Sequence, residues 1–280
     1  SMALERALSK AHLPPSQLGC ILGGDLLNQC IGTTFALRPT NVPFLGLYGA
    51  CSTMAEGLLV ASCLVESGFE QTACAITSSH FCSAERQYRY PLEYGGQRPQ
   101  TAQWTATASG AVVLQKGGMG VRITHATPGR IADPGVTSQA NMGAAMALSA
   151  YETISRFFQD THTGPSHYDL IVTGDLGKVG HQIVIDLFQR DGIDMRPTYD
   201  DCGLLLYDGS QDVHAGGSGC GCSAAVLCSY ILKAMEQGIF RKVLFCGTGA
   251  LLSPTSCNQG QSIPGICHLI CLEADEKWNM

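Results

Sequence analysis

Gly49-Ala-Cys-Ser-Thr-Met54, followed by an apolar run and by Glu66-Ser-Gly-Phe69, is the stretch that decides the fold. Further along the chain the same order of features returns as Gly219-Cys-Gly-Cys-Ser-Ala-Ala225, an apolar run, and Glu236-Gln-Gly-Ile239. Only the first copy has a cysteine at the position of Cys51. The second copy has Gly221 at the corresponding position. A repeated unit of this length predicts two similar halves in one molecule, with loops from both halves meeting at a shared site.

A second pair of strings supports the duplication. Ile21-Leu-Gly-Gly-Asp-Leu26 returns 150 positions later as Ile171-Val-Thr-Gly-Asp-Leu176, in each case after a helical run and a proline-containing turn. The strings around Cys51 return about 170 positions later, so we expect an insertion in the second half around 182–213. We place the two halves at residues 1–140 and 141–280.

The composition favours an α/β protein whose sheets are covered on both faces. The 280 residues are 45% hydrophobic and only 14% charged, and they include 33 glycines. The net charge of −6 provides no basic surface, which argues against nucleic-acid binding. Charged residues such as Glu66 and Lys233 interrupt the longest apolar runs, so we expect a soluble or peripheral protein without a membrane span. Ser1-Met2 resembles a remnant of an expression tag, and we expect natural residues upstream of it.

The fourteen cysteines indicate neither a disulfide framework nor a metal site. They are scattered inside apolar runs and we expect no secretory leader, which is typical of small buried side chains in a reducing compartment. Cys220-Gly-Cys222 has one intervening residue and no matching second pair, so we predict no zinc site and no other metal site.

Strands and helices are predicted to alternate, which favours parallel or mixed sheets with helices on both faces. Residues 78–105 form a long polar loop, which usually covers a site or an interface. Ala111–Leu114 and Val121–Thr124 are predicted to pair as a hairpin around Gly117-Gly118. The predicted helices are 3–12, 52–66, 142–158, 181–191 and 223–237, and the predicted strands are 20–22, 43–48, 72–77, 169–173, 201–206 with 213, 242–246 and 265–272.

Cys51 is the first candidate for chemistry because it lies at a strand-to-helix turn. Free N–H groups and the positive end of a helix favour a thiolate there and lower the thiol pKa below its usual value of ~8.5. The adjacent Gly49 permits close approach of a substrate. A small buried cysteine at a tight turn is an equally good interpretation of the same spacing.

A nucleophilic thiolate needs a base and donors for an oxyanion. His181, on a loop of the opposite half, is the best-placed base, although a surface or helix-capping histidine explains it equally well. His80 and His214 are weaker candidates. Backbone donors for an anion are offered by the glycine-rich turns 216–219 and 247–249. Further donors from the long loop are Ser78, Ser79, Arg86, Arg89 and Arg98.

Over essentially its whole length the chain resembles the thiolase and ketoacyl-synthase superfamily. That resemblance implies a five-layer αβαβα fold of two pseudo-duplicated halves, with Cys51 at the place of the nucleophilic cysteine. More specifically, the chain resembles the stage V sporulation protein AD family. The strings that carry this resemblance are Gly24-Asp-Leu-Leu-Asn-Gln29, Gly49-Ala-Cys-Ser-Thr53, Thr77-Ser-Ser-His80, Ala84-Glu-Arg-Gln87, Arg89-Tyr-Pro91, Glu93-Tyr-Gly-Gly-Gln97, Gly216-Gly-Ser-Gly-Cys220 and Gly249-Ala-Leu-Leu-Ser-Pro254.

The resemblance implies a role in binding and transport rather than catalysis. It implies that the protein binds dipicolinic acid in the pocket corresponding to the enzymes' active site. It also implies that the protein supports uptake of the ligand, with calcium, into the developing spore. Implied partners are a second copy in a homodimer and the membrane subunits of the stage V channel, with a location in the forespore at the inner membrane and no cofactor. We expect six residues of facing loops to contact the ligand: Asn28, Cys51, Ser79, His80, Ser218 and Cys220.

The sequence departs from the condensing enzymes at two positions. The asparagine of the Cys-His-Asn synthases corresponds to Gly221, and His181-Gln182 is followed by Ile183-Val184 where the synthase motif continues with Ala-Asn. The alternative function is an acyltransferase or ketoacyl synthase that uses Cys51, with His181, on acyl thioesters. A third interpretation is an architectural subunit that docks membrane partners without binding a small molecule.

Overall fold

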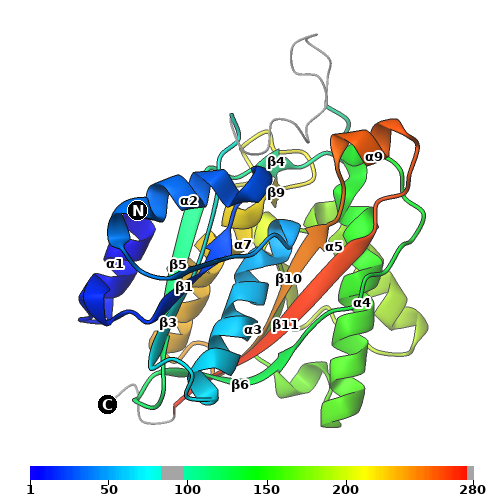
Figure 1. Ribbon diagram of the computed structural model, residues 1–280. Helices are drawn as coiled ribbons and strands as arrows, with labels where there is room; N and C mark the ends of the chain where they lie inside the picture. Colours follow the sequence, from blue (N-terminus) through cyan, green and yellow to red (C-terminus); the bar gives the residue numbers. More distant parts are fainter. Residues whose placement is uncertain (83–97, 276–280) are drawn as a thin grey trace.

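The structure is a computed structural model that describes residues 1–82 and 98–275. Two mixed sheets alternate with three layers of helices (Figure 1). This is the thiolase-like five-layer arrangement that the resemblance implies.

The first sheet has the order β2-β1-β3-β5. Strand β1 (Cys20–Gly24) pairs in parallel with β2 (Phe44–Gly46) and with β3 (Thr72–Ser79). Strand β5 (Ala108–Gln115) pairs antiparallel with β3 and is the last strand of this sheet among the described residues.

The second sheet repeats this topology and adds one strand. Its order is β8-β7-β10-β11-β6, and β7 (Leu170–Thr173) is parallel to both β8 (Tyr199–Asp201) and β10 (Lys242–Ala250). Strand β11 (Gly265–Ala274) is antiparallel to β10, as β5 is to β3. The additional strand β6 (Val121–Thr127) pairs antiparallel with the far edge of β11. The two halves are therefore duplicated in topology, while the boundary at 140/141 stays a prediction.

The helices form two outer layers and one central layer (Figure 1). Helix α1 (Met2–Lys10) packs on β5 and α2 (Ile31–Leu37) on β1, whereas α4 (Met142–Thr161) packs on β11 and on α5 (Gly177–Arg190). The central layer contains α3 (Thr53–Glu66) and α7 (Cys220–Val226), and α7 continues through a π turn (Leu227–Ile231) into α8 (Leu232–Glu236). Shorter elements are α6 (Cys202–Leu205), α9 (Pro254–Asn258) and a two-stranded sheet of β4 (Trp104–Thr105) and β9 (Gly217–Ser218).

Helix α3 is apolar on both sides because it lies between the two sheets. Met54, Ala55 and Leu58 are almost completely buried, and they pack in one cluster with Phe245 of β10 and Ile270 of β11. A helix without a polar face is stable only when it is enclosed. The opening of this helix, where Cys51 lies, is therefore held in the centre of the molecule.

Two predicted elements are wrong. The strands around Gly117-Gly118 form no hairpin, because β5 pairs with β3 in the first sheet and β6 pairs with β11 in the second. The glycines have positive φ angles of 74° and 96°, so they provide a turn, and this turn carries the chain from one sheet to the other. Of the strand predicted at 201–206, only Asp201 lies in a strand, as the last residue of β8. The helix α6 follows, and Asp201 caps it by accepting the Gly203 N–H.

Other bounds shift without changing the element. The helix predicted at 181–191 begins four residues earlier, and β3 and β10 extend to Ser79 and Ala250. Within residues 1–82 and 98–275, none of the helices combines the length and the apolar character needed to cross a membrane.

Candidate binding chamber around Cys51

Cys51 lies in a 3₁₀ turn (Ala50–Ser52) that leads directly into α3. Ala50 has a φ of 53°, and the Ser52 and Thr53 hydroxyls donate to the carbonyls of Gly49 and Ala50. A positive φ is uncommon for a residue with a side chain and marks a turn held by its surroundings. The Cys51 side chain is 8% exposed. The predicted placement at a strand-to-helix turn is thus found.

Asp175, two residues after β7, is a buried acid that contacts this turn. Its carboxyl accepts hydrogen bonds of 3.0 Å from the Ser218 Oγ, the Gly219 N–H and the Thr248 Oγ1. The Cys51 thiol is a further hydrogen-bond partner of the same carboxyl. Burial raises the pKa of Asp175, and these hydrogen bonds oppose the rise.

This arrangement determines which form of the thiol is favoured. A thiol beside a carboxyl can share its proton with the carboxyl oxygen, whereas a thiolate would face a second negative charge. Nucleophilic cysteines lie instead beside positive groups such as an imidazolium. The geometry therefore favours a protonated Cys51.

Four of the six predicted ligand-binding residues lie in one buried network. Cys51 and Ser218 both bond Asp175. The Cys220 Sγ donates to the Ala50 carbonyl at 3.1 Å, next to Cys51. The Ser79 Oγ donates to the Ala106 carbonyl at 2.6 Å and accepts the Gly221 N–H at 2.9 Å. The two halves therefore meet here, as the duplication predicts.

The other two predicted residues lie at the surface. Asn28 is exposed and opens a 3₁₀ turn (Asn28–Cys30), and His80 is exposed at the end of β3, where it lines a surface groove. Both loops lie at strand ends, as predicted from the sequence. The position of a loop does not determine which way its side chains point.

His181 is engaged with β8 and not with the Cys51 turn. Its ring stacks on Tyr199, with centroids 4.6 Å apart and planes at 8°, and it hydrogen-bonds the Tyr199 backbone. The Nε2 atom is buried without a hydrogen-bond partner among residues 1–82 and 98–275. Burial lowers the pKa of His181. His214 is held elsewhere, between the Pro99 carbonyl and Asp212.

Gly221, which corresponds to the synthase asparagine, has no room for a side chain. A Cβ at this position would lie 2.3 Å from the Ala108 carbonyl oxygen and 2.6 Å from the Ser79 Oγ. The amide donor of the Cys-His-Asn synthases is therefore excluded here by backbone packing. This is the clearest structural departure from those enzymes.

A cation, Arg98, lies beside the small two-stranded sheet. Strand β4 pairs with β9 so that Thr105 is opposite Ser218, and the Arg98 guanidinium lies 4.2 Å from the centre of the Trp104 ring. Trp104 in turn stacks on Phe81. Arg86 and Arg89, which we also considered as donors, lie outside the described residues.

Sequence reasoning missed Asp175, although a signal was present. Asp25 and Asp175 occupy the same place in the repeated Gly-Asp strings, and both are buried. Asp25 closes its own turn by accepting the Leu27 N–H, the Thr33 N–H and the Thr33 Oγ1. A buried acid repeated after a strand indicates a structural or functional carboxyl. Within the described residues, no group of three or more His, Cys, Asp or Glu side chains is suited to hold a metal ion.

Comparison with solved structures places the fold among the condensing enzymes. A tetronic acid condensing enzyme is 17% identical, with a TM-score of 0.63 over 98% of this chain and 84% of its own. The 3-oxoacyl-[acyl-carrier-protein] synthase III of Aquifex aeolicus is 14% identical, with a TM-score of 0.60 over 96% and 81%. Xanthomonas campestris OleA with bound lauric acid and lauroyl-CoA is 13% identical, with a TM-score of 0.65 over 97% and 80%. At these identities the likeness shows the fold alone.

Sequence comparison identifies the family. The family described as Stage V sporulation protein AD (SpoVAD) matches residues 1–273. The Stage V sporulation protein AD of Bacillus subtilis (strain 168) is 47% identical over 271 residues, which cover 97% of this chain and 80% of that protein. The chain, a thiolase-like fold whose central cysteine is paired with a buried acid, therefore belongs to the Stage V sporulation protein AD family.

Proposed function

We propose that this sporulation protein is a receptor that binds dipicolinate in the chamber around Cys51 and supports its uptake, with calcium, into the developing spore. The observation that carries the proposal is the pairing of the Cys51 thiol with the buried Asp175 carboxyl. The superfamily's reaction site is retained in position, but its nucleophile is not set up to attack an acyl group.

The chemistry of acyl transfer argues for the same conclusion. Condensation needs a thiolate, a base and donors that stabilise an oxyanion or an enolate. His181 bonds the Tyr199 backbone, and Gly221 excludes the amide side chain. An acyltransferase needs these groups to stabilise a transition state more strongly than it binds the substrate. Their displacement here argues against the enzymatic alternative.

Dipicolinate is a flat aromatic dianion, so its site should offer donors around an apolar slot. The starts of α3 and α7 both lie at the Cys51–Asp175 network, and the positive ends of helices favour anions. Arg98 adds a cation on the neighbouring small sheet. Calcium would arrive with the carboxylates of the ligand as cargo.

Isothermal titration calorimetry with dipicolinate tests the proposal. We expect one saturable site, with binding weakened at least about tenfold in Cys51→Ala and Ser218→Trp, because the first removes a chamber wall and the second fills the chamber. Ser218→Ala is the milder companion that preserves the fold. Cys63→Ala alters an exposed cysteine and is the matched control. Benzene-1,3-dicarboxylate, which lacks the ring nitrogen, should bind more weakly.

Two results would overturn the proposal that the protein is a dipicolinate receptor. If the folded protein gives no heat of binding at millimolar dipicolinate, dipicolinate is not its ligand. An adduct on Cys51 after mixing with acetyl-CoA, detected by mass spectrometry, supports the acyltransferase instead. A protein that does neither, but localises to the membrane only with its partners, fits the architectural subunit.

We also propose that the receptor works as a homodimer at the forespore side of the inner membrane, bound there by the membrane subunits of the stage V channel. Four exposed apolar side chains on α2, β2 and the segment after β2 support a protein interface: Ile31, Phe35, Leu45 and Tyr48.

A further inference from the structure

Residues 98–106 form a strap that lies across the Asp175 and Ser218 side of the chamber. Within the strap, β4 pairs in parallel with β9, which places Thr105 opposite Ser218. Two backbone N–H groups of the strap donate to the carbonyls of Gly216 and Ser218, each at 2.8 Å. In Figure 1 the small sheet lies at the end of the molecule where α3 and α7 begin. The strap therefore connects the segment between β3 and β5 to the chamber wall near β7 and β9.

Side chains along the strap alternate between buried and exposed positions. Gln103 is 3% exposed and Thr105 is completely buried. Trp104, between them, is partly exposed and stacks on Phe81. This is the alternation of an extended strand, whose successive side chains point to opposite faces. Gln103 therefore points towards the chamber wall, as a polar side chain in a buried position.

Gln103 holds the strap to the second half of the molecule. Its Nε2 atom donates to the Asp175 carbonyl at 2.6 Å and to the Gly217 carbonyl at 2.9 Å. The Oε1 atom of the same amide is buried and has no hydrogen-bond partner among residues 1–82 and 98–275. Two buried hydrogen bonds favour the closed position, and an unsatisfied buried acceptor opposes it. The contact is therefore suited to reversible release.

The side chains that a ligand has to reach lie behind the strap. Asp175 and Ser218 are each 1% exposed, and Cys51 is 8% exposed. A binding site encloses most of the surface of its ligand, but the ligand must first be able to enter. Within the described residues the chamber is closed to a planar dicarboxylate, so entry requires a segment to move.

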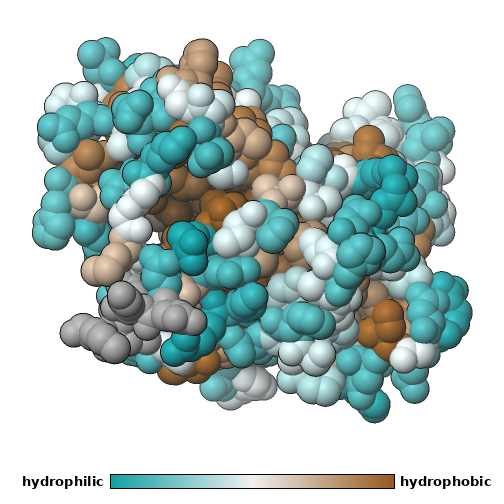
Figure 2. Space-filling model, turned by 90° about the horizontal axis from the view of Figure 1, so that it is seen from below, coloured by the Kyte–Doolittle hydropathy of each residue, from teal (hydrophilic) through white to brown (hydrophobic). Residues whose placement is uncertain are grey.

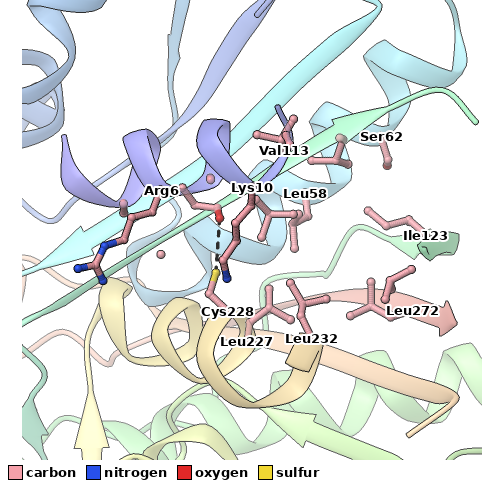
Figure 3. A pocket seen from close by; sticks show the side chains of 18 of the residues that line it. Arg6, Lys10, Leu58, Ser62, Val113, Ile123, Leu227, Cys228, Leu232 and Leu272 are labelled. Atoms are coloured by element: carbon pink, nitrogen blue, oxygen red, sulfur yellow. Dashed lines mark hydrogen bonds between the residues drawn. The ribbon is translucent and has the colours of Figure 1, made fainter. Parts of the chain in front are cut away.

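The large groove of the described structure is not this entrance. It follows β5, and Figure 2 shows an apolar hollow on the corresponding side of the molecule. Figure 3 shows Leu58, Leu227 and Leu232 from the central layer facing it. Among the described residues that line the groove, Ser79 alone belongs to the hydrogen-bonded network around Cys51. The groove thus leaves Cys51 covered.

We propose that Gln103 is a positioning residue that holds the strap closed over the chamber, and that the ligand enters when its two hydrogen bonds break. The identity of the ligand rests on the proposed function. The opening itself does not, because the Cys51 thiol reports it without any ligand. Segments that cover ligand sites commonly open locally while the core stays folded. Opening also lets the Gln103 Oε1 atom reach water, which offsets part of the loss of the two bonds.

Iodoacetamide labelling of the wild-type protein and of Gln103 variants, followed by peptide mass spectrometry, measures the opening. Gln103→Ala removes both hydrogen bonds, and Gln103→Met removes them while keeping the size of the side chain. We expect each variant to speed Cys51 labelling at least about tenfold. Gln182→Ala is the matched control, because it removes a glutamine hydrogen bond from the exposed side of α5. Backbone amide exchange within residues 98–106 should speed up in the Gln103 variants only.

Cys246 distinguishes opening of the strap from unfolding, because it is completely buried in β10. We expect its labelling to stay unchanged in every variant. Equal acceleration at Cys51 and Cys246 would show that Gln103 only stabilises the fold, and it would overturn the proposal. So would unchanged Cys51 labelling in a folded Gln103 variant. Acceleration in Leu26→Ala alone would do the same, since Leu26 packs with Cys51 and is not part of the strap.

Stopped-flow mixing with dipicolinate tests whether the ligand uses this opening. We expect the association rate to rise in Gln103→Ala by about the factor seen in Cys51 labelling, because opening then limits both processes. Faster labelling with an unchanged association rate would overturn entry beneath the strap. Faster labelling of a protein that binds no dipicolinate would overturn the receptor function and still support the role of Gln103.

Discussion

At the residue scale, the Asp175 carboxyl determines the setting of the Cys51 thiol. The same turn and helix start that favour a thiolate in principle here present the thiol to an acid. The two influences oppose each other, and we expect a buried acid that bonds the thiol directly to outweigh a helix end worth about 0.3–1 kcal/mol at an exposed site. We therefore expect Cys51 to line the site as an unreactive thiol and not to act as a nucleophile.

Alkylation rates test this expectation. With iodoacetamide at neutral pH, exposed Cys63 and Cys82 should be labelled well before Cys51, as measured by peptide mass spectrometry. Asp175→Asn removes the acid that opposes a thiolate and should speed Cys51 labelling about tenfold, the equivalent of one pKa unit. Asp133→Asn, at an exposed aspartate, is the control and should change nothing. Wild-type Cys51 reacting as fast as Cys63 would contradict the account.

Asp201 makes stability depend on pH. Its carboxyl accepts the Thr173 Oγ1 at 2.7 Å and the N–H groups of Leu176, Gly177 and Gly203, and burial raises its pKa to about 7. An acid with a raised pKa keeps its proton in the folded state at a pH where the unfolded chain, with a pKa near ~3.9, has lost it. Stability should therefore fall as the pH rises from the unfolded value towards 7, and level off above.

Urea unfolding between pH 6.5 and 8 measures this effect. Burial lowers the pKa of His181 and His268, so their contribution has the opposite sign and lies mainly below pH ~6.5. We expect the free energy of unfolding to fall by about 1 kcal/mol across this range. Asp201→Asn, which does not titrate, should flatten the profile. A wild-type profile that rises with pH would show that the buried acid is ionised in the folded protein.

At the element scale, the contact between β10 and the start of α3 holds the two halves in register. A Cβ at Gly247 would lie 2.6 Å from the Ala55 Cβ, and one at Gly249 would lie 2.6 Å from the Gly49 carbonyl oxygen. These glycines let a strand of the second half approach the Cys51 turn of the first. The shape of the chamber depends on this approach.

Gly247→Ala should therefore destabilise the protein by about 1–3 kcal/mol, because overpacking forces the strand and the helix apart. Gly209→Ala is the matched control, since a Cβ there meets nothing within 4 Å. Urea unfolding of both variants measures the difference. Equal stabilities would mean that the two layers adjust without cost.

The sequence carries much of the element order but not the pairing of elements. Periodicity and the repeated Gly-Asp and Gly-Ala-Cys strings correctly indicate the strands β1, β3, β7 and β10 and the central helix α3. They cannot show that the Gly117-Gly118 turn joins two different sheets, because turn chemistry is local and the partners β3 and β11 are distant in sequence. Site prediction is limited in the same way, since whether Asn28 points inward or outward depends on packing.

At the scale of the whole molecule, the open edge of β2 is the expected dimer contact. Leu45 on this edge is 48% exposed, and Phe35 on the adjacent α2 is 59% exposed. Leu45→Asp should convert a dimer to a monomer, as measured by light scattering after size exclusion, because it places a charge in an apolar interface. Phe69→Asp changes an exposed apolar residue between α3 and β3 and should leave the dimer intact. If the wild-type protein is a monomer in this measurement, the proposed homodimer is wrong.

The central claim is that dipicolinate binds beside Cys51. A crystal structure of the protein grown with dipicolinate measures this. We predict density for the planar ligand between Cys51 and Ser218, with the Cys51 sulfur unmodified. Density only at another surface, or an acyl group bonded to that sulfur after exposure to an acyl thioester, would contradict the account.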